Sequence, residues 1–79
     1  MSIDAFPPDL DYDLLLSRIE SCKGVKRVVD LKVWPVSVTR NALTSKVEVE
    51  SPAEGVEIVR AIRKSLEEFN IEDLTIEIQ

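Results

Sequence analysis

The segment from Gly24 to Trp34 constrains the fold of this chain more than any other stretch. It opens with a glycine that can end a helix in a left-handed conformation, and it continues with alternating apolar and polar residues. Alternation with a period of two is typical of a strand that buries one of its faces. The expected inward residues are Val29, Leu31 and Val33. The expected outward residues are Asp30, Lys32 and Trp34.

Two other segments have the periodicity of amphipathic helices. The first precedes Gly24, begins near a capping Asp9 or Asp11, and repeats apolar residues at i, i+4 and i+7. The second follows residues 51–54, which read Ser-Pro-Ala-Glu and have the form of a capping box with proline at the first helical position. Its end is expected at Asn70, in a left-handed cap. The apolar stripes are Leu15, Ile19 and Cys22 in the first helix, and Val59, Ile62, Leu66 and Phe69, with Ile58 beside them, in the second.

Two more strands complete the pattern, from Leu43 to Glu50 and from Glu72 to Gln79. The order is therefore α-β-β-α-β. A right-handed crossover through the second helix makes the third strand parallel to the second. We predict an α+β fold in which a mixed three-stranded sheet, in strand order 1-2-3, has both helices on one face.

Length and charge exclude several classes of protein. The 79 residues form one domain, and no apolar run is long enough to cross a bilayer. The formal charge of −5 repels phosphate backbones, so a nucleic-acid partner is not expected. Residues 1–8 read as a linker or leader stiffened by Pro7 and Pro8, and residues 9–79 as the domain.

Catalytic patterns are absent from the sequence. It contains no histidine for general acid-base chemistry and no glycine-rich phosphate loop, so we do not expect an enzyme. The single cysteine, Cys22, cannot form an internal disulfide and is interpreted as a small thiol in the core.

The sheet face opposite the helices is predicted to be polar around one large aromatic residue. Its expected members are Asp30, Lys32, Trp34, Thr44, Lys46, Glu48, Thr75 and Glu77. Trp34 has two interpretations, either as a cap on the hydrophobic core or as part of a self-association surface, where tryptophan is enriched.

Several segments, in this order and spacing, resemble the C-terminal cytosolic domain of cation diffusion facilitator (cation efflux) transporters. They are Gly24-Val25, Val29-Asp30-Leu31-Lys32-Val33-Trp34, Leu43 to Val49, Leu66-Glu67-Glu68-Phe69-Asn70-Ile71, and Leu74-Thr75-Ile76-Glu77. The resemblance covers about residues 10–79. It implies a ferredoxin-like, metallochaperone-like α-β-β-α-β domain that forms a homodimer below a membrane domain of the same full-length protein, on the cytosolic side. Such a fragment is expected to be soluble.

The same resemblance exposes a difference at the metal ligands. Zinc-binding members often have histidine where this chain has Val29, Lys46 and, near the last strand, Asp73 and Glu77. A chain with no histidine and one cysteine cannot assemble a tight zinc site, so no zinc site and no cofactor are expected.

Two uses of the altered positions compete with a plain solvated surface. In one, the Lys46 ammonium replaces the metal charge and holds Glu48 and Glu77 at a dimer interface. In the other, Asp30, Asp73 and Glu77 supply oxygen ligands that bind a hard divalent cation weakly. A solvated charged face is the simpler alternative to both.

The sequence therefore leads to two functional hypotheses. The first is a regulatory and dimerising cytosolic domain of a divalent metal cation efflux transporter, such as a zinc transporter, without the histidine zinc site. The second is a free-standing ferredoxin-like module that binds a small molecule or a protein partner through its open sheet face.

Overall fold

The computed structural model of the chain describes residue 7 and residues 10–79, and its element order confirms the predicted α-β-β-α-β arrangement. The elements are α1 (Tyr12–Glu20), β1 (Val25–Pro35), β2 (Asn41–Val49), a short 3-10 turn η1 (Pro52–Glu54), α2 (Gly55–Ser65) and β3 (Ile71–Ile78). Within this part of the chain, no helix is both long enough and apolar enough to span a membrane.

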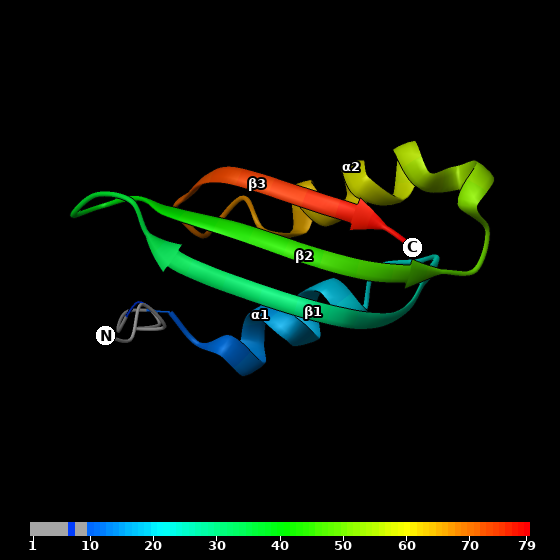
Figure 1. Cartoon of the computed structure of the whole chain (residues 1–79), viewed down its shortest axis with the longest axis horizontal. Helices are drawn as coiled ribbons and strands as arrows, with labels where there is room; N and C mark the ends of the chain where they lie inside the picture. Colours follow the sequence, from blue (N-terminus) through cyan, green and yellow to red (C-terminus); the bar gives the residue numbers. More distant parts are fainter. Residues whose placement is uncertain (1–6, 8–9) are drawn as a thin grey trace.

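The three strands form one mixed sheet with β2 in the centre. β1 pairs with β2 in antiparallel orientation and β3 pairs with β2 in parallel orientation, as the right-handed crossover predicts. Both helices lie on the same side of the sheet (Figure 1). One sheet face is therefore covered by helices and the other is left open.

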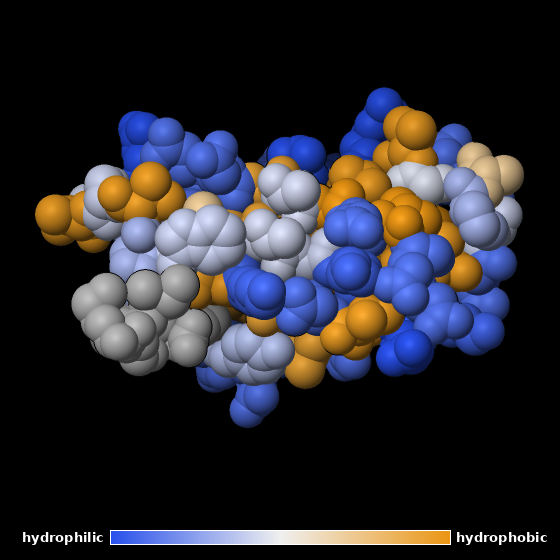
Figure 2. All heavy atoms as spheres, viewed as in Figure 1, coloured by the Kyte–Doolittle hydropathy of each residue, from blue (hydrophilic) through white to orange (hydrophobic). Residues whose placement is uncertain are grey.

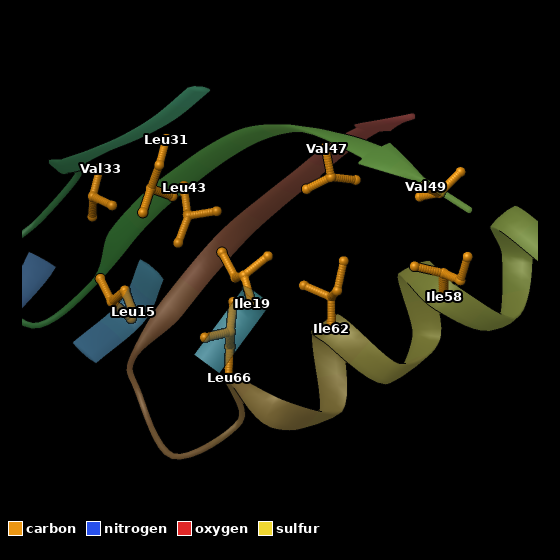
Figure 3. Close-up of a cluster of buried hydrophobic side chains, with 10 residues drawn as sticks. All are labelled: Leu15, Ile19, Leu31, Val33, Leu43, Val47, Val49, Ile58, Ile62 and Leu66. Carbon is orange, nitrogen blue, oxygen red and sulfur yellow. The ribbon is translucent and has the colours of Figure 1, made fainter. Parts of the chain in front are cut away.

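The hydrophobic core fills the space between the sheet and the two helices. In Figure 3 the strand side chains point toward α1 and α2, whose own apolar residues point back. The core residues are Leu15, Ile19, Leu31, Val33, Leu43, Val47, Val49, Ile58, Ile62 and Leu66. The strict alternation of β2 sets this arrangement, because a strand with a period of two can place every second side chain on the covered face.

The ends of α1 are determined by local chemistry that the sequence makes visible. The Asp11 carboxylate accepts hydrogen bonds from the backbone N–H groups of Asp13 and Leu14, at 3.0 and 3.3 Å, which confirms Asp11 as the N-cap. Beyond the helix, Gly24 adopts a φ of +94°. A Cβ at Gly24 would lie 2.8 Å from Cδ1 of Ile58, so both the left-handed backbone and the contact with α2 require glycine here.

β1 departs from the predicted alternation. Its register with β2 shifts between Val25 and Arg27 and again between Val28 and Asp30, so the strand contains two bulges. Because of the second bulge, Val28 packs against the core and Val29 is 37% exposed. The prediction that Val29 faces inward was wrong, since one extra residue in a strand reverses the side-chain pattern before it.

The prediction of a capping box at residues 51–54 was also wrong. Ser51 makes no side-chain cap hydrogen bond, and Pro52–Glu54 form a 3-10 turn before α2 begins at Gly55. Proline at the first position is retained, because it needs no N–H partner there.

The predicted end of the second helix differs in a similar way. α2 ends at Ser65, before Asn70, and no non-glycine residue in the described part of the chain has a positive φ. Instead of a left-handed cap, the Asn70 carbonyl accepts a hydrogen bond from the backbone N–H of Asn41 at 3.0 Å. The buried stripe of α2 and the turn after it is Ile58, Ile62 and Leu66, with Phe69 packed at its edge.

Candidate functional site

The open face of the sheet is the candidate functional surface, because no element of the described chain covers it (Figure 1). The strand register arranges its side chains in cross-strand rows. These rows are Arg27 with Glu48; Asp30, Lys46 and Glu77; Lys32, Thr44 and Thr75; and Trp34, Ala42 and Asp73. Figure 2 shows this face, with hydrophilic residues over the middle of the sheet. The predicted polar face is therefore assembled as expected.

Trp34 occupies one end of this face. It pairs with Ala42, which is only 4% exposed, while the tryptophan itself is 41% exposed and is outside the core cluster. Trp34 therefore does not cap the core. Its assignment to a self-association surface remains a prediction at this point.

Lys46 does not form the predicted cluster within a single chain. In the described residues no carboxylate lies within 4 Å of its ammonium group, although Asp30 and Glu77 flank it in the register. Glu48 pairs instead with Arg27, at 2.6 Å, and is 4.0 Å from Lys26. The result is a half-buried lysine without an ion-pair partner from its own described chain.

The three acidic candidates for weak cation binding do not come together. Asp30 and Glu77 lie on opposite sides of β2, which separates their backbones by about 10 Å. Asp73 lies in the row of Ala42, four residues from Glu77 along β3. Among residues 7 and 10–79, no group of three His, Cys, Asp or Glu side chains is placed to hold a metal ion.

An ion pair between Arg18 and Glu68 lies on the helix side and was missed from the sequence. Arg18 of α1 donates two hydrogen bonds to the Glu68 carboxylate, at 2.9 and 3.1 Å, and one to the backbone carbonyl of Ser65 at 3.2 Å. Its guanidinium carbon lies 5.3 Å from the centre of the Phe69 ring. Arg18 and Glu68 are 50 residues apart in sequence, so no local pattern indicates this pair.

This contact shifts both pKa values. The side-chain hydrogen bond to Glu68 raises the pKa of Arg18, and the same bond lowers the pKa of Glu68, with the opposite charges adding to both effects. Both groups are in contact with solvent, and neither lies on the open sheet face. We assign the pair a structural role that joins α1 to the turn after α2.

Cys22 follows the end of α1 and is half-buried rather than central in the core. Its Sγ lies 3.4 Å from the Arg18 carbonyl oxygen and 3.6 Å from the Ser65 hydroxyl. The expected small structural thiol therefore has polar neighbours on two helices.

A comparison with family models decides the class of the chain. Residues 7–79 match the model described as "Cation efflux protein, cytoplasmic domain". The chain belongs to this family. The resemblance predicted from the Gly24–Trp34 segment and the following strands is thereby confirmed, and with it the assignment to the cytoplasmic part of cation efflux (cation diffusion facilitator) transporters.

A curated relative supports the family at the level of sequence. The cadmium, cobalt and zinc/H(+)-K(+) antiporter of Bacillus subtilis (strain 168) is 26% identical over 80 residues, which cover 98% of this chain. The aligned region is 26% of the antiporter, so the chain spans about a quarter of the length of this relative.

Solved structures share the fold of this cation efflux domain. The metal-bound C-terminal domain of the CzcD transporter from Cuprividus metallidurans superposes with a TM-score of 0.79 at 24% identity, covering 89% of this chain and 99% of that one. The C-terminal domain of MamM in a nickel form (D249N) has a TM-score of 0.73 at 18% identity, covering 85% and 90%. A cadmium form (D249E) has a TM-score of 0.74 at 18% identity, covering 85% and 89%. At these identities the similarity establishes the fold.

Proposed function

We propose that this chain is the regulatory and dimerising cytosolic domain of a divalent metal cation efflux transporter, attached to the membrane transport domain of the same protein. Family membership over residues 7–79 supports the link to cation efflux. It favours this hypothesis over the free-standing module. The domain, residues 9–79, would carry no catalytic chemistry, since the sequence has no histidine for general acid-base work.

The observation that carries the proposal is the open sheet face with Trp34 exposed on it. A domain of 79 residues buries a limited share of its surface, so a second copy can supply burial that the single chain lacks. Tryptophan contributes more to protein interfaces than most residues, because it buries a large rigid area. A two-fold arrangement would place the same face of each copy in the interface.

Lys46 would make this interface selective for a partner that presents carboxylates. The residue is half-buried and its ammonium group has no carboxylate within 4 Å in the described chain, whereas Asp30 and Glu77 flank Lys46 in the register. Carboxylates of a second copy could complete the ion pairs of Lys46. In this arrangement the lysine replaces the charge of a bridging metal, so dimerisation does not depend on zinc.

Weak divalent cation binding is compatible with this proposal, but it is not the source of the dimer. The structural relatives include metal-bound, nickel and cadmium forms. In this chain the acidic candidates Asp30, Asp73 and Glu77 are spread over the face. Each would offer a single oxygen-rich contact, which gives low affinity.

Sedimentation equilibrium of the 79-residue chain tests the proposal. We expect a dimer whose dissociation constant rises by about 30-fold or more in Trp34→Ala, the effect of losing an interface hot spot of about 2 kcal/mol. Lys46→Ala should weaken the dimer by a smaller factor. Addition of EDTA should leave the wild-type dimer unchanged.

The matched control is Val56→Ala, which removes a side chain that is 71% exposed on α2, outside the open face. This variant should dimerise like the wild type. A chain that stays monomeric at all accessible concentrations, or a dimer unaffected by Trp34→Ala, would overturn the proposed interface. A dimer that dissociates in EDTA would overturn its independence of metal.

A further inference from the structure

The turn between β1 and β2 carries the most exposed apolar side chain of the described chain, and a second exposed valine lies beside it. Val38 is 102% exposed and Val36 is 52% exposed, and Trp34 precedes them at the base of the turn. We call residues 36–39 the hairpin tip. In Figure 2 hydrophobic atoms project at the left end of the molecule, where Figure 1 places this hairpin. One fully exposed valine and one half-exposed valine, next to an exposed tryptophan, indicate a contact surface in a domain of this size.

The hairpin tip is also free of charge in a highly charged chain. Residues 33–39 contain no Asp, Glu, Lys or Arg, although such residues make up 32% of the sequence. The nearest cation, Arg40, is paired with Glu72 at 3.5 Å. The tip is therefore a neutral apolar projection on a protein whose net charge is −5.

The backbone of the tip is suited to an apolar surrounding. The N–H groups of Val36 and Ser37 both donate to the carbonyl of Arg40, at 2.9 and 3.2 Å. Backbone N–H groups without a partner are costly to remove from water. Two of the four N–H donors of residues 36–39 are thus satisfied within the turn, which lowers the cost of moving this backbone into a less polar environment.

The position of the hairpin tip in the molecule indicates which apolar surface it can reach. The start of α1, the hairpin and the start of β3 lie at the same end of the molecule, while the start of α2 and the end of β3 lie at the other (Figure 1). The matched CzcD domain is described as a C-terminal domain, and the aligned region is about a quarter of the Bacillus antiporter. A membrane part that precedes this domain would join it at the hairpin end.

We infer that the hairpin tip contacts the lipid surface of the membrane, with Val36 and Val38 entering the boundary between headgroups and acyl chains. This inference rests on the proposed function, because two valines bind lipid too weakly to hold a free domain. A tether to the membrane supplies the high local concentration that such a contact requires. Trp34 lies at the base of the tip, next to the residues that would enter this boundary, so its fluorescence can report contact with lipid.

Quenching of Trp34 by brominated phosphatidylcholine tests the inference, because Trp34 is the only tryptophan. A Cys22→Ala variant is given one added cysteine, either before Met1 or after Gln79, and is coupled to vesicles that contain a maleimide lipid. Attachment before Met1 orients the hairpin end toward the bilayer, and attachment after Gln79 orients the opposite end toward it. We expect about twofold stronger quenching with the first attachment than with the second.

Substitutions then separate the tip from the orientation of the domain. The double variant Val36→Ser and Val38→Ser should lose the excess quenching. The control Val56→Ser changes an exposed valine at the far end of the molecule and should retain it. Equal quenching for the two attachments, or excess quenching that survives the double substitution, would overturn the inference. This includes a tip that contacts protein in place of lipid, since lipid would then not quench Trp34.

The two proposals fail in different ways. If the sedimentation dimer forms and the excess quenching is absent, only the lipid contact is wrong. If no dimer forms while the excess quenching is present, the dimer face is wrong and the lipid contact stands.

Discussion

The two faces of the sheet belong to the same strands but differ in how far their side chains are buried and in what they contact. On the covered face, the side chains of β2 from Leu43 to Val49 are at most 7% exposed and pack against both helices. On the open face, Thr44, Lys46 and Glu48 are half-buried by their cross-strand neighbours alone. Packing on the covered face stabilises the chain by removing apolar area from water. On the open face the strands are joined by backbone hydrogen bonds and cross-strand pairs, and the side chains can still contact a partner.

We therefore expect the covered side of β2 to contribute to the stability of the single chain and its open side to contribute to association. A substitution on the covered face should destabilise the single chain, and one on the open face should affect association. The predictions below test this separation, beginning with the largest expected change in the free energy of unfolding.

Adjacent residues of β2 give the most direct test. Leu43 is 1% exposed in the core, so Leu43→Ala should lower the free energy of unfolding by about 2–5 kcal/mol, from lost burial and the cavity left behind. Thr44→Ala, on the open face, should change it by less than about 1 kcal/mol. Urea denaturation followed by circular dichroism measures both. Equal losses for the two variants would contradict the separation.

The contact between Gly24 and α2 tests how tightly the helix side of the sheet is packed. Gly24→Ala adds a methyl group 2.8 Å from Ile58 on a backbone with a φ of +94°. We expect a loss of about 1–3 kcal/mol in the free energy of unfolding, because both the left-handed backbone and the overpacked contact are unfavourable.

Gly55 provides the matched control for this substitution. Its φ is −56°, and a Cβ there would meet its nearest neighbour at 3.7 Å. Gly55→Ala should therefore stabilise the chain by about 0.4–1 kcal/mol, through a smaller entropy loss on folding. The same denaturation experiment measures both glycine variants, and opposite signs are expected.

Ser45 is a fully buried polar residue on the covered face, and its role follows from the bulge in β1. Its hydroxyl donates to the backbone carbonyl of Asp30 at 2.8 Å, next to the interrupted pairing at Val28 and Asp30. Ser45→Ala should lower the free energy of unfolding by about 0.5–1.5 kcal/mol, since the carbonyl loses a donor in a buried place. Thermal melting measures the change. Ser37→Ala, on the exposed hairpin tip, serves as the control with little expected effect.

The pair of Arg18 and Glu68 predicts the smallest effect, which depends on pH. The hydrogen bond from Arg18 lowers the pKa of Glu68 below its ordinary value of 4.5. The stabilisation is therefore present above that value and is lost as the pH falls through the lower pKa of the folded state. Glu68→Gln should reduce the fall in melting temperature as the pH is lowered from above 4.5 to below it.

The neighbouring acid Glu67 provides the control for the pH experiment. It makes no ion pair within 4 Å in the part of the chain described by the structure. Glu67→Gln should keep the wild-type slope. An identical slope in the Glu68→Gln variant would show that the ion pair does not contribute to acid stability.

Most of the fold could be predicted from local periodicity. The alternation of β2, the Asp11 cap and the left-handed Gly24 all appear in the structure as the residues indicate. The stripe of α2 is displaced by one residue at its start, because Ile58 is buried in the core and Val59, expected there, is only half-buried. Val29 could not be placed, because a bulge inserts one residue and no local pattern marks it in a run of β-branched side chains. The start of the second helix near Ser51 and its end near Asn70 were also misjudged. A local 3-10 bond from the Glu54 N–H to the Ser51 carbonyl forms at the start, and the Asn70 carbonyl accepts from Asn41 of β2 beyond the end.

The members of the open face could be predicted in the same way, but their partners could not. The alternation identifies Lys46 and Glu48 as outward residues of one strand. Which charges meet depends on the register between strands, and that register pairs Glu48 with Arg27 and leaves Lys46 between Asp30 and Glu77. The ion pair of Arg18 and Glu68 depends likewise on how the helices pack.

The sequence by itself determined the order of the elements, most of the core, the family of the chain and the absence of histidine ligands. These features follow from residue type and short-range spacing, which act before any tertiary contact forms. Tertiary structure alone decided the bulge at Val29, the partners of the charged side chains and the projection of Val36 and Val38 at one end. These depend on register and packing, where a shift of one residue or one turn changes every neighbour.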